Sequence, residues 1–324
     1  MRCFCRTVLA VAVCVLLAAP ASSTIIDGYT PSRHDRFSSG GYGGGATLNT
    51  NAFFAGYDFS GVGRAGNQPV TMITPVHGVA SAHFAPSGTV TFVNATGGLV
   101  TRSVASTQTV QDGTNANAQT DLALVTLDAP LLAADQVTHY SLTFPTGRSP
   151  LAGDLALLDQ IELFVYGKQH AVGRNHLDGD THFGVNFSYI NVGSATGVAA
   201  IYDYDPAAGF SPDESQLVSG DSGHPDFIPY SGELVLATTH WAIGSSPGGI
   251  PGAFSTYVPF YAPEIAALVG DYNTANGTSH ELSFTDVLAP IPEPGTFLLL
   301  SFALGALSYR SRSRHRESPR SSTA

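Results

Sequence analysis

The stretch Ser219-Gly220-Asp221-Ser222-Gly223-His224-Pro225 (SGDSGHP) decides how the rest of the chain is interpreted. Gly220 and Gly223 enclose Asp221 and Ser222, and glycine adopts the backbone conformations that a sharp turn needs. Such a turn aims the Gly220 and Ser222 N–H groups at one point, where two donors can hold an oxygen that becomes negative. A serine hydroxyl is a weak nucleophile at its own pKa, so it needs a neighbouring base and an acceptor that orients the base.

Two segments upstream supply these groups. Thr74–Phe84 reads TPVHGVASAHF, and Thr120–Leu127 reads TDLALVTL. His83 ends an apolar run of small residues, and Asp121 begins a run with the apolar content of a strand. In isolation Asp121 could be only a turn or capping acceptor, because Asp often fills that role. The order of the three segments therefore matters more than any one of them.

That order resembles the trypsin/chymotrypsin family, in which His precedes Asp and Asp precedes Ser. The family's TAAHC is similar to Ala80–Phe84 (ASAHF), its DIALL to Asp121–Val125 (DLALV) and its GDSGGP to Gly220–Pro225 (GDSGHP). The resemblance covers most of residues 25–269. It implies an all-β fold of two antiparallel six-stranded β-barrels with a short C-terminal helix. The first barrel is expected over residues 25–134 and the second over 135–271, with the substrate crevice between them.

The resemblance also implies an activity. It points to a serine endopeptidase that hydrolyses peptide bonds through an acyl-enzyme, with no cofactor, no metal and a monomeric state. It makes His83, Asp121 and Ser222 the catalytic residues and the N–H groups of Gly220 and Ser222 the oxyanion hole. The partner expected at this site is a protein or peptide substrate.

Four further residues are expected to bind substrate by the same resemblance. His240 and Trp241 stand where the family has its Ser-Trp substrate-binding strand, and Gly252 lies in a segment similar to the closing strand. Gln216, six residues before Ser222, corresponds to the floor of the primary specificity pocket. A neutral amide there could not recognise Lys or Arg as a carboxylate does, so cleavage after basic residues is not expected.

The sequence departs from the family at two points. Phe84 follows His83 where the family has cysteine, and His224 replaces the second glycine of GDSGGP. His224 could crowd the nucleophile or point away from it, and a local packing change is favoured. The alternatives that these departures leave open are a catalytically inactive protease-fold binding module at the cell surface and a structural envelope or matrix protein.

Composition favours short strands over long helices. Of the 324 residues 43% are hydrophobic and 12% charged, with 35 Gly and 20 Pro. One helix is expected from Pro263 to Gly270, and the Gly/Ser-rich stretch Ser38–Gly45 is interpreted as a loop. The segments with the length and composition of strands are Pro69–Ile73, Thr89–Asn94, Leu122–Leu127, Ile161–Tyr166, Gly184–Val192, Val198–Tyr204 and Leu234–Thr239.

The N-terminal end reads as a secretory signal peptide over residues 1–21. Arg2 and Arg6 precede an apolar run from Val8 to Ala19, and Ala19-Pro20-Ala21 offers small residues for cleavage. The chain is therefore expected to be exported.

The exported body is acidic and free of cysteine. Between Thr24 and Ile291 it carries 7 basic and 23 acidic residues, a net charge of −16, which disfavours nucleic acid and anionic membrane surfaces as partners. Cys3, Cys5 and Cys14 all lie in the signal peptide, so disulfides cannot hold the mature fold.

The C-terminal end resembles a PEP-CTERM sorting signal. After a polar linker over 272–290, residues 291–324 contain Pro292-Glu293-Pro294, an apolar run Phe297–Leu307 and an arginine cluster from Arg310 to Arg316. The resemblance implies processing by an exosortase-type enzyme, an extracellular or cell-surface location and transient membrane anchoring. A simple tail anchor is the alternative.

Three other patterns carry weaker interpretations. His77 is the alternative to His83 as the catalytic base, but it is better interpreted as a strand residue. Ile25–Gly28 (IIDG) is either an activated N-terminus that pairs with Asp221 or a simple strand. His176–His182 and Asp203–Asp205 invite a metal, but their spacing matches no established ligand loop, and a Gly-Asp turn explains the first segment.

Overall fold

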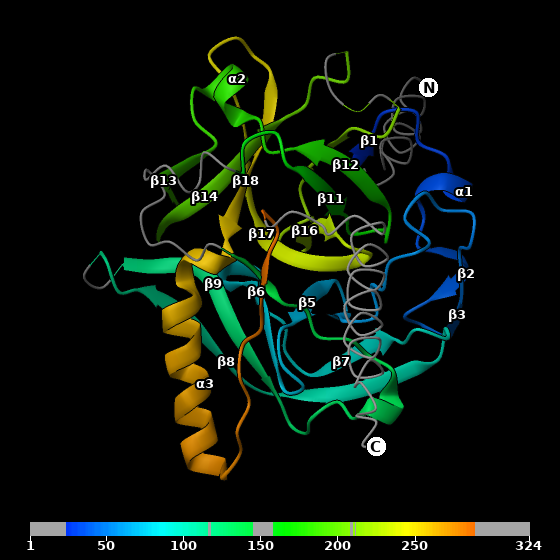
Figure 1. The fold of residues 1–324 in the computed structure, drawn as a ribbon, viewed down its shortest axis with the longest axis vertical. Coiled ribbons are helices and arrows are strands. Elements are labelled where there is room, and N and C mark those ends of the chain that lie inside the picture. The colour runs from blue at the N-terminus through cyan, green and yellow to red at the C-terminus, as the bar shows by residue number, and fades with distance from the viewer. Residues whose placement is uncertain (1–23, 116–117, 145–157, 208–209, 211, 289–324) are drawn as a thin grey trace, which may run out of the picture. The chain divides into compact units, whose positions relative to one another are not determined.

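The computed structural model describes residues 24–115, 118–144, 158–207, 210 and 212–288. Within these residues β-strands are the main secondary structure, and most of them form two curved sheets that belong to one compact unit extending to Val287 (Figure 1). Residues 1–21, expected to be a signal peptide, and residues 291–324, expected to be a sorting tail, lie outside the described residues.

The first sheet is a closed barrel with the strand order β4-β5-β6-β9-β8-β7. Its core includes Val70, Met72, Phe92 and Val125, which are all fully buried. The strand β9 is buried on both faces, because one face points into the barrel and the other contacts the second sheet at β14. The barrel strands are β4 (Val62–Ala65), β5 (Gln68–Met72), β6 (His77–Ser81), β7 (Thr89–Val93), β8 (Leu99–Asp112) and β9 (Ala118–Leu127).

The second sheet is a curled half-barrel, so the prediction of two closed six-stranded barrels was right for the first sheet only. A loop covers the β12 edge, where Arg174 forms an isolated parallel bridge with Glu214, and β12 does not pair with β13 at the other end. The main path follows the order β12-β11-β16-β17-β18-β14-β13. Its strands are β11 (Glu162–Tyr166), β12 (Val172–His176), β13 (Phe187–Val192), β14 (Ala195–Asp203), β16 (Pro225–Tyr230), β17 (Glu233–Ser245) and β18 (Pro251–Tyr257).

Two short strands extend this sheet in parallel. The strand β10 (Leu142–Phe144) pairs with β17, and β19 (Phe284–Asp286) pairs with β10. The expected linker over 272–290 therefore contributes a strand to the fold. Within the described residues, short 3₁₀ turns lie at Ala82–Phe84, Ala133–Asp135 and Val258–Tyr261.

The glycine-rich stretch expected to be a loop forms a hairpin. The strands β2 (Phe37–Gly41) and β3 (Gly45–Leu48) pair with each other, and Gly40 and Gly45 adopt positive φ angles of 73° and 81°. The glycines therefore supply the turn conformation that joins two strands.

The C-terminal helix α3 (Ala262–Asn276) is longer than predicted. It was expected to stop at Gly270, but it continues to Asn276 and ends at Gly277, whose φ of 64° is the usual left-handed cap. Gly270 is exposed and stays helical. Tyr272 in the added turns packs against the barrel core, which stabilises the extension.

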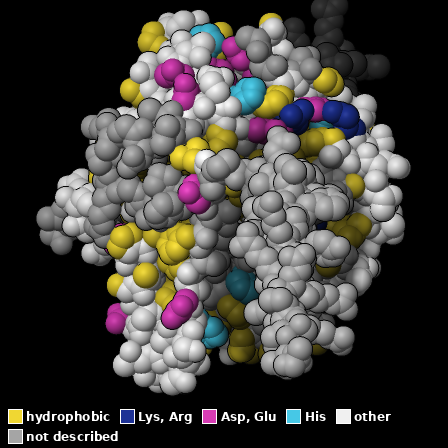
Figure 2. All heavy atoms as spheres, viewed as in Figure 1, with side chains coloured by type: hydrophobic (Ala, Val, Ile, Leu, Met, Phe, Trp, Pro, Cys, Tyr) yellow, Lys and Arg dark blue, Asp and Glu magenta, His cyan; other side chains and the backbone are white. Residues whose placement is uncertain are grey.

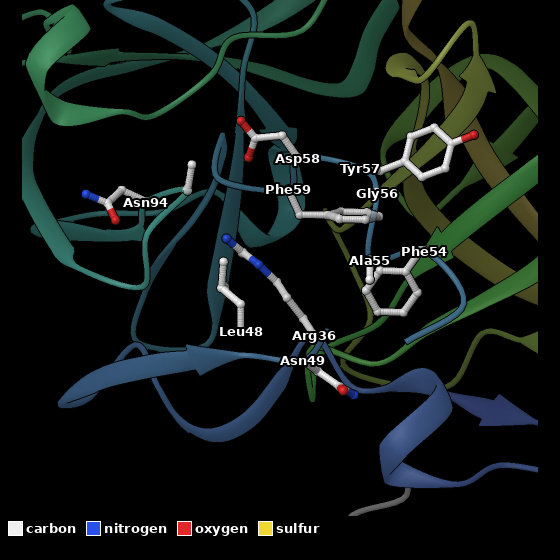
Figure 3. A pocket seen from close by; sticks show the side chains of 11 residues that line it. Arg36, Leu48, Asn49, Phe54, Ala55, Gly56, Tyr57, Asp58, Phe59 and Asn94 are labelled. Atoms are coloured by element: carbon white, nitrogen blue, oxygen red, sulfur yellow. The ribbon is translucent and has the colours of Figure 1, made fainter. Parts of the chain in front are cut away.

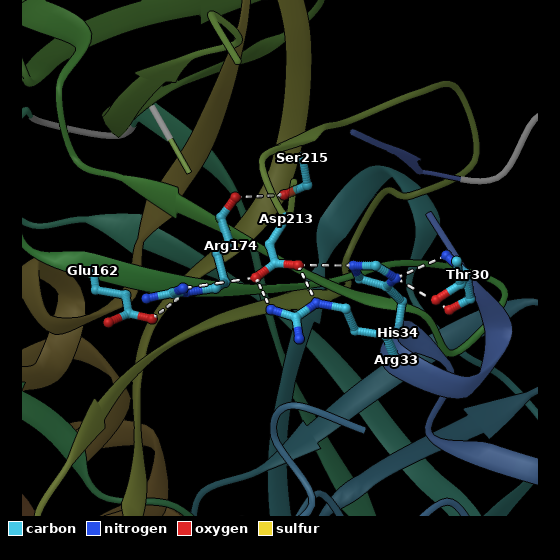
Figure 4. Close-up of polar contacts among 7 residues, drawn as sticks. All are labelled: Thr30, Arg33, His34, Glu162, Arg174, Asp213 and Ser215. Carbon is cyan, nitrogen blue, oxygen red and sulfur yellow. Dashed lines mark hydrogen bonds and ion pairs between the residues drawn. The ribbon is translucent and has the colours of Figure 1, made fainter. Parts of the chain in front are cut away.

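The N-terminal segment is held on the second sheet through a buried carboxylate. The strand β1 (Ile25–Ile26) pairs with β15 (Ser215–Gln216), and the short helix α1 (Pro31–His34) follows it. Arg33 donates two hydrogen bonds of 2.6 Å to Asp213, and the His34 ring nitrogen Nε2 lies 3.1 Å from the same carboxylate. Figure 4 shows these groups and Arg174 converging on Asp213.

Candidate active site

His83 follows β6 directly and lies beside the start of the neighbouring strand β9. Its backbone N–H donates to Asp121 Oδ1 at 3.0 Å, and its ring Nδ1 lies 2.9 and 2.8 Å from the two Asp121 oxygens. Antiparallel pairing of β6 and β9 places Ser81 opposite Leu122, so Asp121, which precedes Leu122, lies close to Ala82 and His83, which follow Ser81. The local sequence of the barrel therefore fixes the pair.

The environments of the two side chains differ. The Asp121 side chain is 2% exposed, whereas that of His83 is 47% exposed and can reach a substrate. The hydrogen bond with Asp121 raises the pKa of His83 above its ordinary value, and this effect outweighs partial burial, which lowers it.

Ser222 comes from the other sheet, in the turn between β15 and β16. Its Oγ lies 3.0 Å from His83 Nε2. Gly220 and Gly223 have φ angles of 97° and 77°, which residues with side chains rarely adopt. A Cβ atom on Gly223 would lie 3.1 Å from the Ser81 backbone nitrogen, so the glycine also allows the turn to approach β6 closely.

Hydrogen bonds hold the turn in this shape. The Asp221 carboxylate accepts from the backbone N–H groups of Lys168 and Val218 at 3.0 and 2.8 Å, and Gly223 N–H donates to His240 O at 2.8 Å. Within the described part of the chain, no acceptor is bonded to the Gly220 or Ser222 N–H. Both donors can therefore serve a ligand.

A cavity of about 190 Å³ opens beside Ser222. Its walls are Leu217–Ser222 on one side and His240–Ile243 on the other, so His240 and Trp241, both expected to bind substrate, line it. Gln216 is not among its lining residues; it belongs to β15 and pairs with Ile25. Gln216 was chosen by counting six residues back from Ser222, which assumes that the loop has the family's length. In this chain that count reaches a residue in a paired strand.

Gly252 is also not among the residues that line this cavity. It lies in β18, and a Cβ atom on it would be 2.4 Å from the Phe183 ring. Phe183 of the helix α2 (Gly179–Phe183) therefore covers this glycine.

A second cavity of about 410 Å³ lies on the other side of the pair His83 and Asp121. It extends to Val192–Ala195, the turn between β13 and β14, and shares Trp241 with the first cavity. Ser222 and His83 therefore lie between the two cavities, which together could bind an extended peptide chain.

Sequence reasoning missed Asp226, which bonds with His240 behind the wall of the first cavity. Its Oδ1 lies 2.5 Å from His240 Nε2, and Asp226 is fully buried. Burial alone would lower the pKa of His240, but the Asp226 carboxylate raises it above its ordinary value. A lone acid in an apolar strand, four residues after the nucleophile, was the available signal.

His224 points away from the nucleophile, so it does not crowd the site. Its buried ring stacks on Tyr166 at 6.1 Å between centroids, and its Nδ1 lies 2.9 Å from Asp221 O. Burial lowers its pKa far below the ordinary value. The substitution of glycine is therefore a change in packing behind the turn.

The other candidates lie apart from Ser222. His77 begins β6, bonds with Thr74 Oγ1 at 2.9 Å and contacts the Tyr272 ring; burial lowers its pKa to about 4. Ile25 is 43% exposed and forms the strand β1, while backbone N–H groups occupy the Asp221 carboxylate. The strand interpretation therefore describes both segments.

Another cavity of about 260 Å³ lies elsewhere in the molecule, and its lining offers fewer side chains that could act in catalysis. Arg36 lies among the side chains that line it (Figure 3), and its guanidinium donates to Tyr42 OH at 2.9 Å and to Val93 O at 2.7 Å. Its described lining contains no serine, cysteine or histidine.

A separate group of potential metal ligands, His182, Asp203 and Asp205, lies near α2.

Comparison with known proteins adds no relative. No family model matches the chain, and no curated protein matches it. Within residues 24–288, as far as they are described, no helix is long and apolar enough to cross a membrane. The chemistry of the site is therefore inferred from its own geometry.

Proposed function

We propose that this protein is an exported serine endopeptidase that cleaves peptide bonds through an acyl-enzyme. The observation that carries the proposal is the hydrogen-bonded series Asp121, His83, Ser222, with 2.8 Å between carboxylate and Nδ1 and 3.0 Å between Nε2 and the hydroxyl. These are the distances over which a base can take the proton of a nucleophile. Its fold would be a variant of the chymotrypsin type in which the second barrel is only half formed.

The proposed reaction begins when Ser222 Oγ attacks the scissile carbonyl carbon and His83 Nε2 takes the hydroxyl proton. Asp121 keeps the ring in the correct tautomer and stabilises its cationic form. The carbonyl oxygen becomes negative and accepts from the Gly220 and Ser222 N–H groups, each worth about 3–4 kcal/mol in the transition state.

The second half of the reaction releases both products. His83 returns the proton to the leaving amine as the C–N bond breaks, which leaves an acyl ester on Ser222. Water then gives a proton to His83 and attacks the ester, and the acid product departs as the hydroxyl is restored. The residues of this chain suffice for each step.

The geometry also supports a preference against basic side chains in the first cavity. The two acids nearest to it already have partners, since Asp221 accepts from backbone N–H groups and Asp226 bonds with His240. Neither offers a free carboxylate to Lys or Arg. We also propose that the N-terminal signal directs export and that an exosortase-type enzyme processes the tail.

A fluorophosphonate probe tests the proposal, because it reacts with a serine only when a base activates the hydroxyl. The purified protein is expected to be labelled, and Ser222→Ala should remove the label. Ser219→Ala is the matched control, since Ser219 is an exposed serine in the same turn. Absence of labelling in folded protein, or equal labelling of the Ser222 variant, would contradict the proposal.

A further inference from the structure

A group of acidic and histidine side chains lies near the short helix α2 and the end of β14. His182 belongs to α2, Asp203 is the last residue of β14, and Asp205 follows in the next loop. One potential ligand atom from each residue lies within 4.8 Å of the others. In Figure 2, acidic and histidine side chains gather at the end of the molecule that carries α2.

Asp203 has an unusual environment within this group. Its side chain is fully buried, and its Oδ2 lies 2.5 Å from His182 Nδ1. Its Oδ1 is buried as well, and no hydrogen-bond partner for it exists among the described residues. Buried carboxylate oxygens nearly always have partners in folded proteins, so this atom points to a missing ligand.

Two further acids surround the group and add to its negative charge. Asp178 Oδ1 accepts from the Asp203 backbone N–H at 3.4 Å, and both Glu214 oxygens accept backbone N–H groups, from Asp205 and Phe210. A cation bound to the group would be attracted by these carboxylates.

We propose that His182, Asp203 and Asp205 bind one divalent transition-metal ion of the Zn²⁺ class. One imidazole nitrogen and two carboxylates suit Zn²⁺, whereas Ca²⁺ and Mg²⁺ prefer oxygen ligands alone. The ion would replace the hydrogen bond between His182 and Asp203 and would use the free Asp203 oxygen. It would tie α2 to the loop after β14, as a structural site that is independent of the proposed activity.

The experiment measures metal binding directly. The full exported protein is prepared with Ser222→Ala to prevent self-digestion, stripped with a chelator, and titrated with Zn²⁺, Ca²⁺ and Mg²⁺ at neutral pH. Calorimetry and elemental analysis after dialysis are expected to give one Zn²⁺ per chain, and Zn²⁺ alone should raise the melting temperature.

Two ligand variants and a matched control identify the site. His182→Ala and Asp205→Asn alter partly exposed residues, so both should fold, and each should weaken Zn²⁺ binding at least about tenfold. Asp180→Asn is the control, because Asp180 is an exposed acid on the same helix and should leave binding unchanged. The proposal is wrong if Zn²⁺ does not bind, if both ligand variants bind it as well as the parent, or if Ca²⁺ stabilises the protein and Zn²⁺ does not.

Discussion

At the scale of single residues, the environment of His83 sets the conditions under which the proposed site can work. A general base must be neutral before it can take a proton, and the bond with Asp121 holds the pKa of His83 above its ordinary value. As the pH falls through that raised pKa, the ring gains a proton and loses its role. Hydrolysis should therefore fail on the acid side and persist at neutral and mildly alkaline pH.

Asp121→Asn tests this dependence. The amide cannot raise the pKa of His83 as the carboxylate does, so the acid limb of kcat/KM should move to lower pH. The loss of tautomer control should also reduce kcat by about 10³–10⁴-fold. A pH profile of peptide hydrolysis measures both effects, with Asp128→Asn as a control at an exposed acid. An unchanged acid limb would mean that Asp121 does not act on His83.

The sequence predicted the three members of the candidate triad but not all of the residues that surround them. Sequence order was enough to select His83, Asp121 and Ser222, because each lies in a segment with a recognisable local pattern. Asp226 has no such pattern, and its meeting with His240 depends on the register of β16 and β17, which shifts at Asp226. Long-range register cannot be read from local sequence.

At the scale of elements, the core strands were easier to predict than the glycine-rich and polar ones. Leu122–Leu127 and Thr89–Val93 carry continuous apolar or alternating patterns, and both are strands in the barrel. The strand β8 is mostly exposed along its 14 residues, so it lacks an apolar signal. It forms because backbone bonds to β7 and β9 close the barrel.

The attachment of α1 to the second sheet depends on Asp213. Burial alone would raise the pKa of this carboxyl, but hydrogen bonds from Arg33 and His34 lower it below its ordinary value. The group therefore stays ionised and continues to accept from both side chains. This contact fastens the N-terminal segment beside the β12 edge of the second sheet.

Asp213→Asn should destabilise the protein by on the order of 3 kcal/mol, the lower end for a broken buried ion pair, because Arg33 keeps 44% of its side-chain surface in water. Urea unfolding at neutral pH measures the difference. Glu233→Gln, at an exposed acid in β17, should change the free energy of unfolding little. Equal stability of the Asp213 variant and the parent would show that β1 alone fixes the segment.

At the scale of the whole molecule, the all-β character followed from composition, but the closure of each sheet did not. Short strands and frequent glycines predict an all-β body, and this prediction is confirmed. Whether a sheet closes depends on which edges find each other in space. The β12 edge contacts the loop at Glu214 instead of another long strand. No local sequence pattern predicts this contact.

The two sheets meet where β14 contacts β9 and β17 contacts β6. His83 belongs to the barrel and Ser222 to the half-barrel, so their 3.0 Å contact depends on this junction. In a urea titration, peptide hydrolysis should disappear at a lower concentration than the circular-dichroism signal of the strands, because the junction can loosen before either sheet unfolds. Coincident losses would mean that the sheets separate only on global unfolding.

His83 and Ser222 come from different sheets, and this arrangement also limits what a partly unfolded molecule can do. Under the proposed function, a molecule that has begun to open exposes its own backbone to neighbouring copies, while its Ser222 hydroxyl moves out of reach of the His83 imidazole. Such a molecule can be digested but cannot digest others. If the proposed activity holds, heat or chemical stress would then produce unfolded chains that the intact copies degrade, and no partly folded chain would keep cutting.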